Sequence, residues 1–271
     1  MTTVAVMPPL LSPEELGELE YAARCLEGGG FAARATRLLG RQVEAIERAL
    51  PAPARKTIAR VAESALKLAL RFALRTIDHK SPAKAAKGLH KAAAAASGAL
   101  GGAFGFASTA VELPVSTTIL LRSIAEIARE EGEDLSRADA ALACVEVFGL
   151  GGAAPGETAL EGGYFAVRGA LAQSVSESAR FIARRGLIDG SAPALARLVS
   201  QVATRFGVAV SEKVAAQAVP VLGAIGGAAV NVAFAEHFQT LARGHFIVRR
   251  LERVHGAETV RFEYQRLRNQ T

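Results

Sequence analysis

Three ionisable side chains stand among apolar residues and could carry out acid–base chemistry: Glu112, His237 and His245. Glu112 is the only charged residue between Lys91 and Arg122, in a stretch rich in small and apolar residues. A carboxylate and an imidazole that converge in a pocket can act as general base and general acid on a bound substrate. These residues therefore define one functional alternative, a hydrolase-like enzyme with a buried Glu/His site that acts on a lipid-like substrate.

The spacing of the two histidines argues against a metal site. His237 and His245 are eight residues apart, which corresponds to about 12 Å of rise along one helix. Two ligands of one metal ion on a helix are normally three or four residues apart. The segment GGAAPGET at 151–158 resembles a phosphate-binding loop, but Glu157 occupies the position where such loops need a lysine. We therefore expect no metal, no cofactor and, as the first choice, no catalytic activity.

Glu112 needs a partner, because a buried carboxylate without one is costly to desolvate. Arg122 is the nearest cation in the sequence, and three further residues are expected to be able to reach Glu112 through the fold: Arg168, Arg243 and His237. Two interpretations remain open at this stage. One is a buried ion pair that only stabilises the fold, and the other is a polar site where two glycine-rich hairpins meet.

The composition predicts that these side chains are positioned by helices. Half of the 271 residues are hydrophobic, but there is no tryptophan and there are only three tyrosines, so the apolar residues are mainly alanine, valine and leucine. Such a composition favours closely packed helices, and no segment alternates polar and apolar residues as a strand would. We predict an all-α fold in which an N-terminal helical segment, 1–54, and a helical domain, 55–271, form one compact unit.

Local signals set the expected limits of several helices. Ser12 and Glu15 have the spacing of a capping box at the start of a helix, and the glycines at 28–30 end it. A second helix is expected over 32–50, where two prolines follow it closely. Pro114 is expected to break the next apolar stretch into two helices.

Doubled glycines recur in apolar surroundings. The segment GALGGA at 98–103 returns as GAIGGA at 223–228, with a weaker echo, GLGGA, at 149–153. Glycines four residues apart on one helix face allow a second helix to approach closely, so we predict two pseudo-repeated glycine-rich helical hairpins. The segment at 223–228 lies within a stretch of 22 residues, 214–235, that carries no charge. A buried helix is the favoured interpretation, and a transmembrane span or a hairpin that dips into the bilayer is the alternative.

Positive charge is concentrated in one part of the chain. Residues 34–91 contain fourteen lysines and arginines and four acidic residues, which gives this segment a net charge of +10. The net charge of the whole protein is +6. Eight of these cations recur at helical spacing on two consecutive amphipathic helices: Lys56, Arg60, Lys67, Arg71, Arg75, Lys84, Lys87 and Lys91. This pattern is typical of a helix face that binds an anionic membrane surface.

Two other interpretations of the basic segment remain open. A plain solvated face has the same pattern. Nucleic-acid binding is disfavoured, because Phe72 is the only aromatic residue among the cations of this amphipathic segment and no helix-turn-helix spacing is present. The first residues lack the basic and apolar regions of a secretory signal, and the distant pair Cys25 and Cys144 suits a reducing compartment. We therefore expect a cytoplasmic protein.

Three long segments resemble the EcsC protein family: ELPVSTTILLRSIAEIAREEGEDLSRADAALACVEVFGLGG, YFAVRGAL and VPVLGAIGGAAVNVAFAEHFQTLARGHFIVRRLE. The resemblance covers roughly residues 55–265. It implies a bacterial helical protein, from a family that is named for a component encoded beside an ABC transporter and that is largely without an assigned biochemical activity. The polar residues at the matching positions, besides His237 and His245, are Glu112, Thr117, Arg122, Glu146, Tyr164, Arg168, Asn231, Gln239 and Arg243.

Together these observations favour a non-catalytic accessory protein that lies peripherally on the inner face of the membrane. Its expected partners are anionic lipid or, as the family resemblance implies, a transporter-linked membrane protein. The motivation is the +10 segment together with the glycine-rich apolar hairpins. The enzyme with Glu112, His237 and His245 in one site is the alternative.

Overall fold

The predicted all-α fold is confirmed. The computed structural model describes residues 11–40, 43, 47, 50–76, 109–152, 163–185, 193–218 and 223–269. Within these ranges the secondary structure is helical and contains no strand. The helices are α1 (Pro13–Glu27), α2 (Phe31–Leu39), α4 (Ala52–Thr76), α6 (Thr109–Glu130), α7 (Ala138–Leu150), α8 (Tyr164–Arg185), α9 (Pro193–Gln217), α10 (Gly223–His255) and α11 (Ala257–Arg268).

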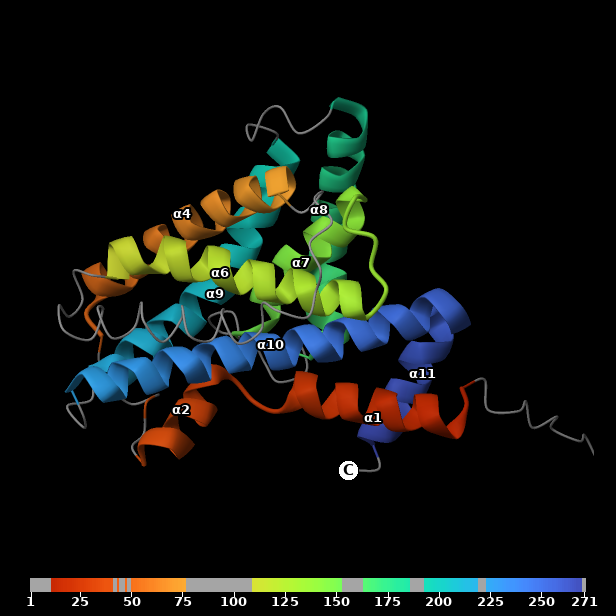
Figure 1. Ribbon diagram of the computed structural model, residues 1–271, viewed down its shortest axis with the longest axis horizontal. Coiled ribbons are helices and arrows are strands. Elements are labelled where there is room, and N and C mark those ends of the chain that lie inside the picture. The colour runs from red at the N-terminus through yellow and green to blue at the C-terminus, as the bar shows by residue number, and fades with distance from the viewer. Residues whose placement is uncertain are drawn as a thin grey trace, which may run out of the picture.

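The helices pack around α10, which at 33 residues is the longest of those described. Helices α4, α6, α10 and α1 lie in this order from one side of the molecule to the other, and α7, α8 and α9 pack behind them (Figure 1). Helix α10 contacts α1, α2, α6, α7, α9 and α11. The N-terminal helices α1 and α2 therefore pack directly against the rest of the protein.

The core consists of one large and one small cluster of buried side chains. The large cluster contains interlocking phenylalanines from three helices, Phe148, Phe206 and Phe238, whose ring centroids are 4.9 to 5.6 Å apart. The small cluster lies where α1 and α11 cover α10, around Tyr264. These aromatic rings add large buried surfaces to a core that consists mainly of alanine, valine and leucine.

The capping box at the first helix is confirmed. The backbone N–H of Glu15 donates to Ser12 Oγ at 3.2 Å, and the backbone N–H of Ser12 donates to the Glu15 carboxylate at 2.7 Å. The expected helix over 32–50 is wrong in its length, because α2 ends at Leu39. Gly40 adopts a left-handed conformation with φ of 63° and donates to the Thr36 carbonyl, which terminates the helix.

Two further expectations, on Pro114 and on the uncharged segment 214–235, are also corrected. Helix α6 continues through Pro114, because a proline in the second turn removes only one backbone hydrogen bond. The uncharged segment 214–235 is not one helix: α9 ends at Gln217 and α10 begins at Gly223. Pro220 lies between them, outside the described residues. No helix of the described residues is long and apolar enough to cross a membrane.

Glycines allow close helix contacts at the end of α7. A Cβ atom on Gly152 would overlap the backbone carbonyl oxygen of Arg205 on α9, and one on Gly151 would overlap the Phe238 ring on α10. The glycines of the segment GLGGA at 149–153 therefore allow close approach of neighbouring helices, as the sequence predicts. The structure describes this segment as far as Gly152. The segment at 98–103 lies outside the described residues, so the pairing of two glycine-rich hairpins stays a prediction.

Replacement of Gly152 by alanine is expected to destabilise the fold. The new methyl group would displace the backbone of α9 at Arg205, at a cost of about 1–3 kcal/mol. Gly169→Ala is the matched control, because no atom lies within 4 Å of its Cβ position on α8; it is expected to stabilise the protein by about 0.5–1 kcal/mol. Urea denaturation of both variants measures the difference, and equal stabilities would contradict the close contact.

Candidate functional site

Glu112 forms a buried ion pair, but its partner is none of the expected residues. The Lys213 ammonium on α9 donates to the Glu112 carboxylate at 2.7 Å, and the Asn231 amide on α10 donates to the same oxygen at 3.0 Å. Burial lowers the pKa of Lys213, and the neighbouring Glu112 opposes that shift. The prediction that Glu112 pairs with one of the residues Arg122, Arg168, Arg243 or His237 was wrong, because α9 places Lys213 beside Glu112.

His237 has a structural role at the end of α7. Its Nε2 lies 3.1 Å from the Gly151 carbonyl oxygen, which can only accept a hydrogen bond, so Nε2 carries the proton. The ring packs against Phe31 and Phe238 and is almost completely buried. This burial lowers the pKa of His237 to about 4, so the imidazole is neutral at neutral pH.

The structure does not bring Glu112, His237 and His245 into one site. Glu112 bonds to Asn231, which lies on α10 six residues before His237 and fourteen before His245. These spacings correspond to about 9 Å and 21 Å of rise along the helix. Within the described residues the three groups share no hydrogen-bond partner.

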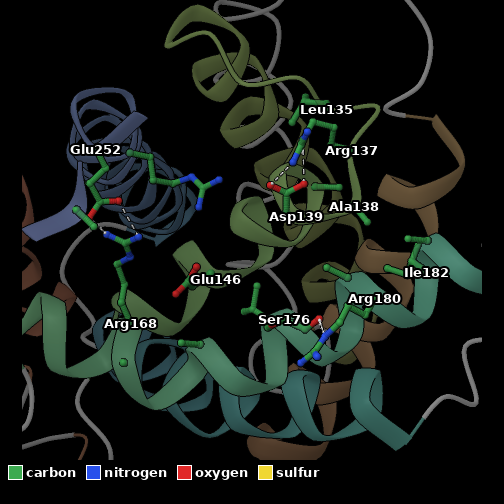
Figure 2. Close-up of a pocket in the computed structure, with 18 of the residues that line it drawn as sticks. Leu135, Arg137, Ala138, Asp139, Glu146, Arg168, Ser176, Arg180, Ile182 and Glu252 are labelled. Carbon is green, nitrogen blue, oxygen red and sulfur yellow. Dashed lines mark hydrogen bonds and ion pairs between the residues drawn. The ribbon is translucent and has the colours of Figure 1, made fainter. Parts of the chain in front are cut away.

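A large pocket opens elsewhere, between α7, α8, α10 and α11, with a volume of about 1010 Å³ (Figure 2). Glu146, Arg168, Arg249 and Glu252 form its polar floor, and all four are at least partly buried. The walls are apolar and come mainly from α7 and α8: Leu135, Ala138, Phe165, Ala172, Val175, Ala179 and Ile182. Three exposed arginines stand at its edge: Arg137, Arg180 and Arg261.

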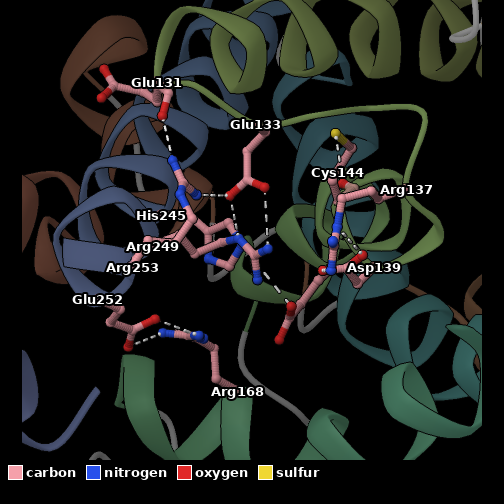
Figure 3. Close-up of polar contacts among 12 residues, drawn as sticks. Glu131, Glu133, Arg137, Asp139, Cys144, Arg168, His245, Arg249, Glu252 and Arg253 are labelled. Carbon is pink, nitrogen blue, oxygen red and sulfur yellow. Dashed lines mark hydrogen bonds and ion pairs between the residues drawn. The ribbon is translucent and has the colours of Figure 1, made fainter. Parts of the chain in front are cut away.

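Two arginine–carboxylate pairs hold the floor together (Figure 3). Arg168 on α8 donates to both oxygens of Glu252 on α10, at 2.8 and 3.0 Å. Arg249 on α10 donates to both oxygens of Glu133, in the turn between α6 and α7, at 2.7 and 3.3 Å. Bidentate pairs of this kind fix both position and orientation. The floor is therefore a rigid junction of α7, α8 and α10.

Hydrogen bonds behind the floor determine the tautomer of His245. Arg168 donates to the Tyr164 hydroxyl oxygen at 3.2 Å, and the Tyr164 hydroxyl lies 3.1 Å from His245 Nδ1. Because arginine can only donate, the tyrosine proton is free to go to Nδ1. Burial, reinforced by the Arg168 and Arg249 cations, lowers the pKa of His245 well below its usual range. The imidazole is thus neutral, with its proton on Nε2.

Glu146 is the one floor residue that lacks a hydrogen bond within the described part of the chain. Its carboxyl lies 4.0 Å from His245 Nε2, a distance that is too long for a hydrogen bond. His245 Nε2 also has no hydrogen-bond partner within the described residues. The Glu146 carboxyl points into the pocket in Figure 2. Burial raises the pKa of Glu146, and attraction by Arg168 and Arg249 opposes this shift only in part.

The remaining residues from the family resemblance lie in other places. Gln239 donates to the Ser123 hydroxyl at 2.7 Å and, with Lys213 and Asn231, lines a cavity of only about 20 Å³. Thr117 is buried beside this region, and its hydroxyl has no partner among the described residues. Arg122 and Arg243 are exposed. The Glu112 region is therefore a packed polar contact with too little space for a substrate.

Half of the predicted membrane-facing cations can be placed. Lys56, Arg60, Lys67 and Arg71 are all exposed on α4. The side chain of Arg75 and the whole of Lys84, Lys87 and Lys91 lie outside the described residues.

Sequence reasoning missed four residues of the two polar sites: Glu133, Lys213, Arg249 and Glu252. His245, Arg249 and Glu252 are spaced four and three residues apart, which places them on one face of α10. That spacing was the available signal for the pocket floor. Within the described residues, no group of three or more His, Cys, Asp or Glu side chains could hold a metal ion.

His237 is expected to make the fold sensitive to acid. The unfolded chain binds a proton near the ordinary pKa of 6.5, whereas the folded protein does so only near pH 4. The free energy of unfolding should therefore fall as the pH drops from 6.5 to 4, by about 3 kcal/mol from this residue. Urea denaturation across this range, compared with His237→Gln, measures the effect. A variant with the same pH dependence as the wild type would show that His237 titrates normally in the fold.

The comparison with known protein families assigns the chain as a whole. The family model described as the EcsC protein family matches residues 17–251, a range that runs from α1 to α10 and includes the residues of both polar sites except Glu252. No curated protein and no solved structure matches the chain significantly. Because the family model covers most of the sequence, the protein belongs to the EcsC protein family.

Proposed function

We propose that this protein is a non-catalytic, membrane-associated accessory protein that binds anionic lipid through α4. The observation that supports this proposal is the exposed face of α4, which carries Lys56, Arg60, Lys67 and Arg71. On a helix these positions fall within about 60° of one another. Each cation near an anionic membrane surface contributes about 1 kcal/mol to binding.

The packing of α4 supports a peripheral mode of binding. Its opposite face is apolar and is buried against α6 and α9, through residues such as Ile58, Leu66 and Leu70. Helix α4 lies at the outside of the helix stack in Figure 1, so its cationic face is accessible without unfolding. Leu68 is half exposed beside the cations and adds an apolar contact at the lipid interface.

The proposed place of action is the cytoplasmic face of the inner membrane. The anionic lipids of that leaflet attract cationic helices of this kind. A transporter-linked membrane protein, which the family resemblance implies as a partner, would be met at the same surface. Anionic lipid and a transporter-linked membrane protein, the two expected partners, would thus both be reached at the proposed location.

One observation supports the alternative proposal of an enzyme: His245 lies close to Glu146 at the pocket floor. The residues originally predicted for this enzyme do not support it, because Glu112 bonds to Lys213 and His237 bonds to Gly151. Within the described residues, the hydroxyl group that is hydrogen-bonded to His245 is that of Tyr164. Burial and the nearby carboxylates raise the pKa of Tyr164, so this hydroxyl is a poor candidate for a nucleophile. We therefore favour binding over hydrolysis.

Flotation with lipid vesicles tests the proposed function. The full-length protein is expected to float with vesicles that contain phosphatidylglycerol, to remain behind with phosphatidylcholine alone, and to dissociate in high salt. Reversal of three α4 cations, K56E, R60E and R71E, should weaken binding by about 100-fold or more.

The matched control reverses three exposed arginines on other helices: R37E, R184E and R268E. It has the same net charge as the α4 variant, so it is expected to retain most of the binding. Equal losses in both variants would show that only total charge matters, and absence of flotation by the wild type would overturn the proposal. Binding that survives salt and alkaline extraction would instead indicate insertion into the bilayer.

A further inference from the structure

We infer that the pocket between α7, α8, α10 and α11 binds a single-chain amphiphile by its anionic headgroup, a carboxylate or a phosphate monoester. The inference does not depend on the proposed membrane-surface role, since α4 contributes no residue to this pocket. It stands on the hydrogen-bonding groups of the floor, the apolar walls and the charge of the lining.

The floor offers more hydrogen-bond donors than its own carboxylates use. A guanidinium has five N–H groups, and the contacts of Arg168 to Glu252 and Tyr164 use three of them. The contacts of Arg249 to Glu133 use two. The N–H groups left over on both arginines favour a ligand headgroup that is rich in acceptor oxygens.

Glu146 adds a second, independent indication of a ligand. Its side chain is only 6% exposed, points into the pocket and forms no hydrogen bond within the described residues. Buried polar groups are normally hydrogen-bonded, so such an exception needs an explanation. A protonated Glu146 would donate to an anionic oxygen of the headgroup, which the space beside it can receive.

The walls fit an aliphatic chain. Three large apolar residues of α8, Phe165, Val175 and Ile182, line the pocket, and Ala172 and Ala179 lie on the same face of the helix between them. The volume of about 1010 Å³ corresponds to the upper end of the range for small-molecule sites, roughly 300–1,000 Å³. The pocket therefore has room for a headgroup together with a chain.

The charge of the lining selects an anion over a cation. Five arginines line the pocket, against Asp139, Glu146, Glu252 and Glu258. Arg137 is paired with Asp139, Arg168 with Glu252 and Arg249 with Glu133. At the edge this leaves two exposed arginines, Arg180 and Arg261, and one exposed carboxylate, Glu258. This excess of positive charge is expected to attract an anionic headgroup.

Isothermal titration calorimetry with three probes of equal chain length tests the inference. Dodecanoate and dodecyl phosphate are titrated into the full-length protein below their micelle concentrations, with dodecyltrimethylammonium as the cationic counterpart. At least one anion is expected to bind about tenfold or more tightly than the cation. Preference for the phosphate indicates a lysophospholipid-type ligand, and preference for the carboxylate indicates a fatty acid.

Gly169→Leu blocks the pocket without a packing conflict. No atom lies within 4 Å of the Gly169 Cβ position, which lines the pocket on α8, and leucine favours the helix over glycine. Binding of the anion should weaken by about tenfold or more. Gly17→Leu is the matched control, because Gly17 is also an exposed helical glycine with open space around its Cβ, on α1; it should bind like the wild type.

Three results would overturn the inference: no binding of either anion, equal binding of the cationic probe, or unchanged binding by Gly169→Leu. Failure here is distinguishable from failure of the membrane-surface proposal. Gly169→Leu should still float with anionic vesicles, and the K56E, R60E, R71E variant should still bind the monomeric amphiphile.

Discussion

The fold depends on how the polar groups of one long, largely buried helix, α10, are satisfied. A helix covered by six neighbours can carry polar side chains only where a neighbour supplies the partner. Asn231 bonds to α6, His237 to the end of α7, and Arg249 to the turn between α6 and α7. Each partner comes from a different place in the chain, so these bonds specify how the surrounding helices are placed along α10. Loss of one partner would leave a buried polar group unpaired, which is far more costly than the bond itself.

Close packing sets a second requirement, and glycine meets it at two crossings of α10 with its neighbours. Gly151 faces the Phe238 ring at the end of α7, and Gly244 faces α1, where a Cβ would lie 2.9 Å from the Ala22 carbonyl oxygen. At Gly151 the absent side chain makes room for the aromatic ring, and at Gly244 it lets the backbone of α1 approach the backbone of α10. The polar bonds and the close contacts thus act on the same helix, and together they hold the pocket floor in place.

Two surfaces with different chemistry result from this arrangement. Helix α4 presents a row of lysines and arginines to solvent, suited to a large anionic surface and independent of any one ligand geometry. The pocket presents paired arginines and an unbonded carboxyl, Glu146, inside apolar walls, which suits one small molecule. The two surfaces share no helix, so the proposed membrane binding and the proposed ligand binding involve separate parts of the protein.

The sequence by itself determined the fold class, the capping box at Ser12 and the exposed face of α4, because these follow from composition, local spacing and the period of one helix. The family followed from the resemblance of three long segments. It also identified Glu112 as a buried carboxylate in need of a partner. Only the tertiary structure decided that this partner is Lys213, 101 residues away, and that His245 meets Glu146 while His237 meets Gly151. Helical periodicity tells which side of a helix a residue occupies, but it contains no information on which other helix covers that side. For the same reason the pocket, which four helices build from distant segments, was not visible in any one stretch of sequence.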